Sequence, residues 1–169
     1  MKRGFRVAQA ILIMCCPAMT RLPSAVRWGA LLVKSAHGKE VEKMGNKVEQ
    51  LLSAWCETLL RLRVSGTGHD RLDGAILCPA CGRVHGRCGD AMYPFLHMAK
   101  ETGDAKWIDA AKGLFFWMDR VVGLPNGRLL NDIDSSWEGI TVFFVEQLAL
   151  CLKNYETLLD DVTVAQWRG

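Results

Sequence analysis

Four residues able to bind a metal ion lie close together in the chain: Cys78, Cys81, His85 and Cys88. Two thiolates separated by two residues, followed here by Gly82, form a knuckle whose backbone N–H groups point at the sulfur atoms, and a further His or Cys completes a tetrahedral zinc site. The same spacing also suits a disulfide if the chain is exported, or reduced thiols near a helix start. We therefore expect a constrained cysteine pair, either bound to structural zinc or oxidised, with plain thiols as the alternative.

The segment from His85 to Asp90 also contains side chains that suit sugar chemistry. Arg87 can bind a sugar-acid carboxylate through two hydrogen bonds, and a histidine exchanges protons near neutral pH. On this basis His85 and Asp90 are candidate catalytic residues, and Arg87 is a candidate substrate-binding residue. The alternative is structural, with Arg87 paired to Asp90 at the start of a helix.

A third group lies further along the chain, where Asn131, Asp132 and Asp134 are followed by Trp137. Carboxylates accept hydrogen bonds from sugar hydroxyls, an indole ring packs on the C–H face of a sugar, and glycosidic chemistry uses paired carboxyl groups. We assign Asp132 to catalysis and the other three residues to substrate binding. The same acids also suit the N-terminus of a helix, where the helix dipole favours negative charge.

Four helices are expected to position these groups, because apolar residues recur at steps of three or four along 41–62, 89–102, 105–121 and 137–159. The β-branched run 140–145 alone would suit a strand, but the length of the apolar segment favours a buried helix. Aromatic residues at helical spacing are assigned to the core. They are Trp55, Trp107, Trp117, Phe115, Phe116, Phe143 and Phe144.

Antiparallel packing of neighbouring helices would place the connections 65–88 and 123–136 at one end of the assembly and the short turn 101–104 at the other. Gly103 is expected to end one helix and Asp104 to begin the next. All the candidate site residues lie in or beside the two long connections. Long polar loops on a helical scaffold are a common place for binding and catalysis.

The segment 101–112, followed by an aromatic-rich helix, resembles the helix-hairpin repeat of the six-hairpin (α/α) toroid glycosidases and polysaccharide lyases. Segments 78–90 and 131–139 resemble the N-terminal region of toroid proteins of that kind. The resemblance covers about 41–160 and implies an all-α fold of antiparallel hairpins, a glycoside hydrolase or polysaccharide lyase activity, and an oligo- or polysaccharide partner.

A closed toroid has about twelve helices, and this chain supplies about four. The resemblance therefore implies a partial (α/α)6 toroid, the N-terminal portion of a larger enzyme, inactive alone and prone to self-association through unpaired helix faces. The alternative is a non-catalytic helical-repeat module that binds a protein or a glycan and carries a Cys-rich structural knuckle.

The charge distribution separates residues 1–37 from the helical domain expected over 38–169. The N-terminal segment holds six of the 21 basic residues and no acid, which leaves 15 bases and 18 acids in the remainder. This slightly acidic remainder argues against a nucleic-acid partner. The apolar run 7–16 is too short to span a membrane and fits either an export signal or an amphipathic start. A signal would imply a secreted or periplasmic protein, and otherwise the chain is cytoplasmic.

Overall fold

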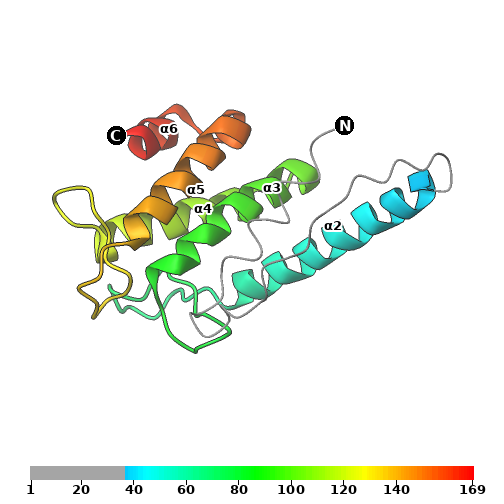
Figure 1. Ribbon diagram of the computed structural model, residues 1–169. Helices are drawn as coiled ribbons and strands as arrows, with labels where there is room; N and C mark the ends of the chain where they lie inside the picture. Colours follow the sequence, from blue (N-terminus) through cyan, green and yellow to red (C-terminus); the bar gives the residue numbers. More distant parts are fainter. Residues whose placement is uncertain (1–36) are drawn as a thin grey trace, which may run out of the picture.

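Five α-helices, joined by loops and short helical turns, make up the part of the chain that the computed structural model describes, residues 37–169 (Figure 1). The α-helices are α2 (His37–Arg61), α3 (Met92–Thr102), α4 (Lys106–Trp117), α5 (Ile140–Tyr155) and α6 (Asp161–Arg168). The shorter turns are η2 (Gly86–Ala91), η3 (Met118–Val122) and η4 (Glu156–Leu158). The leader expected over 1–37 lies outside the described residues, except for His37 at the start of α2.

The all-α class expected from the sequence is confirmed over 37–169, where isolated bridges occur but no β-strand forms. The ring of a toroid is not present in these residues. Among the described helices, none combines the length and apolar character needed to cross a bilayer.

The turn between α3 and α4 forms at Gly103 as the sequence predicts, but the N-cap of α4 is Ala105 and not Asp104. Gly103 adopts a left-handed conformation with φ of 69°, and its N–H donates to the Ala99 carbonyl at 2.8 Å. The Asp104 carboxylate accepts from the Lys106 N–H at 3.0 Å, which satisfies a donor that the first turn of α4 leaves without a backbone partner. The two helices then pack with the Phe95 and Trp107 rings 5.8 Å apart.

The end of α4 differs from a regular helix because its last turn, η3, is a π-helix. Gly123 follows it, and its backbone lies so close to the Asp119 carbonyl that a Cβ at this position would collide with the oxygen. A glycine is therefore needed here for close approach and not for its backbone angle, since φ is −71°.

The helix expected over 137–159 is shorter than predicted at both ends. Trp137 stays outside α5 because its N–H donates to the Ser135 hydroxyl and its carbonyl accepts from the Asn131 N–H. At the other end Asp160 starts the separate helix α6, with its carboxylate accepting from the Thr163 N–H at 2.8 Å. This cap was not recognised in the sequence.

A buried core fills the space between the helices, and α3 contacts α2, α4 and α5. Trp107, Trp117, Phe115 and Phe144 are buried as expected. The assignment of Phe116 and Phe143 to the core was wrong, because these side chains are 40% and 36% exposed. Val142 and Val145 on the outer face of α5 are also exposed.

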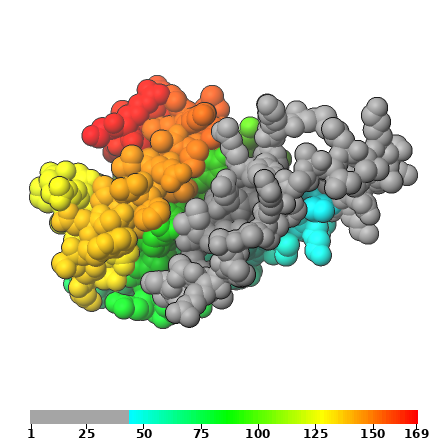
Figure 2. Space-filling model, in the orientation of Figure 1, coloured from blue at the N-terminus to red at the C-terminus, as the bar shows by residue number. Residues whose placement is uncertain are grey.

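The two long connections lie at the same end of the helices, as the antiparallel arrangement predicts. In Figure 1 the loop before η2 and the yellow loop before α5 meet at the lower left, away from the α3–α4 turn. In Figure 2 the gold atoms of the second loop adjoin the green atoms around η2 on the same face. Four isolated antiparallel bridges organise the loops, and one of them joins His85 to Asp132.

Candidate functional site

The knuckle at Cys78 is a tight hairpin held by backbone hydrogen bonds. Leu77 and Val84 form an antiparallel bridge, and the Cys78 N–H donates to the Arg83 carbonyl at 2.8 Å. Within the turn, the Gly82 N–H donates to the Cys78 carbonyl at 2.9 Å, and Gly82 takes a left-handed φ of 65°. A glycine adopts this conformation without a steric penalty, which explains why it follows the second cysteine.

Three of the four expected metal ligands come together at this hairpin. The Sγ atoms of Cys78 and Cys81 and a ring nitrogen of His85 all lie within 4.8 Å of one another. Cys78 is buried, whereas Cys81 is exposed. The Nδ1 atom of His85 is buried and has no hydrogen-bond partner. These three residues form a group that could hold a metal ion.

Cys88, the fourth expected ligand, is engaged elsewhere. Its Sγ donates to the Ile76 carbonyl at 3.1 Å, and burial raises the pKa of its thiol to about 12. No disulfide joins the cysteines among the described residues. The structure therefore places Cys88 as a buried thiol behind the hairpin.

The backbone of His85 pairs with the second loop through its antiparallel bridge to Asp132. The adjacent Gly86 N–H donates to the Asn131 carbonyl. Burial lowers the pKa of the His85 imidazole, although the Asp132 carboxylate acts in the opposite direction. His85 and Asp132, expected together from the sequence, are thus brought together by the fold.

The Asp132 carboxylate organises its own loop. It accepts from the Asp134 N–H at 3.2 Å and lies 3.6 Å from the Arg83 guanidinium. Its side chain is only 16% exposed, whereas the Asp134 side chain is 84% exposed. Trp137 is 54% exposed, and its ring lies so close to Gly139 that a Cβ there would collide with it.

A shallow depression of about 360 Å³ lies between the two loops. Its lining residues are Val64, Leu72, Leu77, Gly82, Arg83, Val84, Asp132, Ile133 and Asp134. Arg71 stands beside it, donating to the Ile133 carbonyl at 3.0 Å. Sequence reasoning missed both arginines. Arg83 could have been found from its position between the knuckle and His85, but no local signal marks Arg71.

Arg87 and Asp90 do not join this depression. Their ion pair, 2.9 Å long, lies beneath α5, and the Arg87 guanidinium sits 4.1 Å from the centre of the Phe143 ring. The Asp90 side chain is only 6% exposed, and burial raises its pKa to about 6 although Arg87 favours the charged form. The geometry agrees with the structural alternative for this pair.

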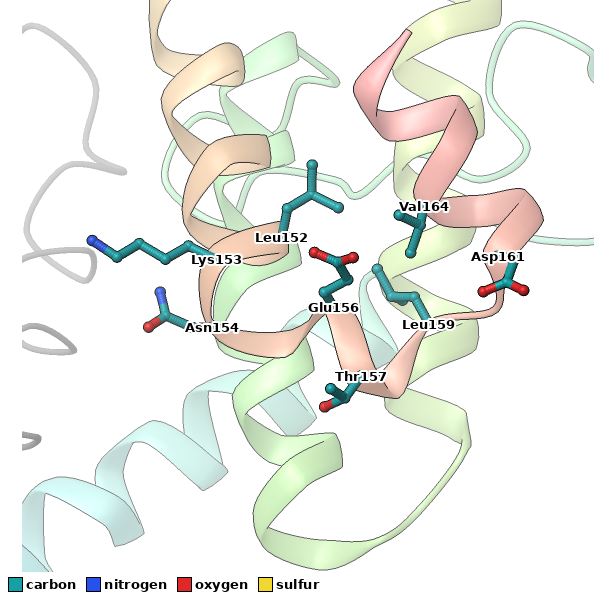
Figure 3. Close-up of a pocket in the computed structure, with 8 residues that line it drawn as sticks. All are labelled: Leu152, Lys153, Asn154, Glu156, Thr157, Leu159, Asp161 and Val164. Atoms are coloured by element: carbon teal, nitrogen blue, oxygen red, sulfur yellow. The ribbon is translucent and has the colours of Figure 1, made fainter.

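Two larger hollows lie away from the predicted residues. One, of about 600 Å³, lies between α5 and α6, where Glu156 and Leu159 point inward while Lys153 and Asn154 point away (Figure 3). The other, of about 560 Å³, is a groove along α4, α5 and α6. Neither hollow is lined by a residue that the sequence marked as a site residue.

Comparison with known proteins identifies the family. Residues 52–169 match the family model described as the ulvan lyase N-terminal domain. The chain belongs to the ulvan lyase N-terminal domain family. A broad-specificity ulvan lyase of Formosa agariphila is 37% identical over 147 residues, which are 86% of this chain and 23% of that protein. No solved structure matches the chain.

The matched region of this ulvan lyase N-terminal domain begins inside α2 and includes both loops and all the candidate site residues. The relation to polysaccharide lyases implied by the hairpin resemblance is therefore confirmed. The chain spans less than a quarter of the length of the curated relative it matches.

Proposed function

We propose that this chain is the N-terminal helical part of a polysaccharide lyase with a partial (α/α) toroid, and that its paired loops form one wall of the substrate site. The antiparallel pairing of His85 with Asp132 carries the proposal, because it joins the knuckle loop to the loop that holds Trp137. The family relation supplies the class of substrate, a polysaccharide such as ulvan.

The exposed groups on this wall suit a polysaccharide that contains sugar acids. Lyases act by elimination next to a uronate carboxylate, and a guanidinium group binds a carboxylate through two parallel hydrogen bonds. Arg83 and Arg71 are 66% and 57% exposed beside the depression. Asp134 accepts hydrogen bonds from hydroxyl groups, and the open Trp137 ring offers a surface for the C–H face of a sugar.

The remaining candidate residues have either a structural role or a role in proton transfer. Asn131 and Asp132 shape the loop, and we assign proton exchange with a bound sugar to Asp132, which lines the depression. Arg87 and Asp90 form an ion pair within η2 and so stabilise this turn. Elimination needs groups on both sides of the bond and a site that excludes water, which one shallow wall does not provide. The chain alone therefore binds polysaccharide weakly and turns nothing over.

The test combines binding and turnover measurements on the 169-residue chain. Affinity electrophoresis in gels containing ulvan should show retardation that Arg83→Ala and Trp137→Ala each reduce. Arg168→Ala serves as the matched control, because Arg168 on α6 is a similarly exposed arginine that pairs with Glu156 of η4. The ultraviolet absorbance of unsaturated uronates should stay flat.

Turnover that disappears in Asp132→Asn would refute the inactivity of the chain alone while supporting the site. Tight binding to a protein, without any affinity for glycans, would instead favour the non-catalytic helical-repeat module.

A further inference from the structure

We propose that Cys78, Cys81 and His85 bind one zinc ion, which fastens the knuckle hairpin to the start of η2 and so holds the first loop against the second. The site is independent of the polysaccharide assignment, since a structural metal serves any function of the paired loops.

The positions of the ligand atoms fit a zinc ion. Zinc–sulfur bonds of about 2.3 Å and zinc–nitrogen bonds of about 2.0–2.1 Å put the ligands of one tetrahedral ion about 3.5–3.8 Å apart. The three ligand atoms already lie within 4.8 Å of one another without an ion. Small side-chain rotations are therefore enough to close the group.

The His85 ring provides a second, independent observation. Its Nδ1 atom is buried without a hydrogen-bond partner, and a buried polar atom left without a partner is costly. A bound metal ion would satisfy such a nitrogen. The Cys78 and Gly82 backbone N–H groups are fixed by the turn itself, so the hairpin is shaped before any metal arrives.

The chemical types of the three ligands indicate which metal ion the site prefers. Two thiolates and an imidazole are ligands that zinc prefers, whereas magnesium and calcium prefer oxygen. Cys88 is not in the group of ligand atoms that lie within 4.8 Å of one another, and its sulfur donates to the Ile76 carbonyl. Exposed Cys81 leaves the group open to solvent, so the fourth position is available to a water molecule.

Zinc would matter to this loop because hydrogen bonds, more than buried apolar side chains, hold it in place. Between α2 and η2, few apolar side chains are buried, namely Ala75, Ile76 and Cys78. Binding of a metal to the folded form alone adds its binding free energy to the stability of that form. The ion would also fix the backbone on either side of Arg83, which lies between two of its ligands.

The experiment uses the reduced, metal-free 169-residue chain, titrated with Zn²⁺ and with Co²⁺ as a spectroscopic probe. We expect one ion per chain, a thiolate-to-cobalt charge-transfer band, and a higher melting temperature with zinc. Cys78→Ser and Cys81→Ser should each lose the thiolate-to-cobalt band. His85→Gln should bind the metal ion about tenfold or more weakly than the parent chain. Cys88→Ser is the matched control, because serine keeps a donor for Ile76, and it should bind like the parent chain.

Three results would overturn the proposal. The first is a reduced, folded chain that binds no zinc on titration. The second is a Cys78–Cys81 disulfide, shown by mass spectrometry, in protein purified without reductant. The third is a Cys88→Ser chain that loses the cobalt band as completely as Cys81→Ser while keeping its circular dichroism spectrum, since this would assign the ion to another ligand set.

Discussion

His85 and Asp132 lie opposite one another in an antiparallel bridge, the first in the loop before η2 and the second in the loop before α5. The hydrogen bond from the Gly86 N–H to the Asn131 carbonyl extends this pairing by one residue on each side. The two loops therefore form one surface, and a change in the backbone of one loop will alter the conformation of the other.

Asn in place of Asp160 should destabilise α6. The carboxylate accepts from the Lys112 ammonium group at 2.7 Å and from the Thr163 N–H, and these partners, Lys112 first, hold its pKa below the usual range. A group with a lowered pKa stabilises the fold above its unfolded pKa, and this stability is lost as the pH falls through the folded value. Thermal melts should thus show a gap between parent and Asp160→Asn at pH 7 that closes in acid.

The neighbouring substitution Asp161→Asn is the control for this prediction, because Asp161 is in the first turn of α6 but does not cap it. An equal loss of melting temperature in both variants would contradict the role of the Asp160 charge beside Lys112, since asparagine still caps the helix.

Asp90→Asn should change the pH dependence of stability in the opposite sense. Burial raises the pKa of Asp90 to about 6 from its ordinary value of 3.8, so ionising this group opposes folding as the pH rises through that interval. The parent chain should lose about 3 kcal/mol relative to Asp90→Asn between pH 3 and pH 8. Urea unfolding across this range measures the difference, with exposed Asp119→Asn as the control. A parent chain that gains stability relative to Asp90→Asn would contradict the burial argument.

Much of the helical framework could be predicted from the sequence, because helical periodicity and the glycine at position 103 are local signals. The break before α6 could not, because the Asp160 carboxylate also depends on Lys112 from a distant helix. The cysteine group was found from spacing, but its separation from Cys88 depends on Ile76 in the preceding loop. Arg71 was missed because its partner, the Ile133 carbonyl, is remote in sequence.

Gly123 and Gly127 are needed for different reasons, the first for a close backbone approach and the second for a left-handed backbone conformation. Gly123→Ala should destabilise the protein by about 2–3 kcal/mol, because the new methyl group would overlap the Asp119 carbonyl oxygen. Gly127 has a left-handed φ of 78° and open space around it, so Gly127→Ala should cost only about 1–2 kcal/mol. Chemical denaturation of both variants tests this order, and the reverse order would contradict it.

Lys in place of Val142 and Val145 should reduce self-association of the chain. These side chains are 70% and 56% exposed on the outer face of α5, and adjacent exposed apolar groups favour contact with another apolar surface. Sedimentation velocity should show less dimer for the double variant. Val162→Lys, at a 68% exposed position on α6, is the control. Equal dimer in all three proteins would mean that the α5 face does not mediate association.

The most direct test of the paired-loop account is a titration of the isotopically labelled chain with ulvan oligosaccharides, followed by amide and indole chemical shifts. The account predicts progressive shifts in the loops around Arg83 and Asp134 and at the Trp137 indole, with α6 unaffected. Shifts confined to the hollow between α5 and α6, or no shifts at millimolar oligosaccharide, would contradict the assignment of the paired loops as a polysaccharide-binding surface.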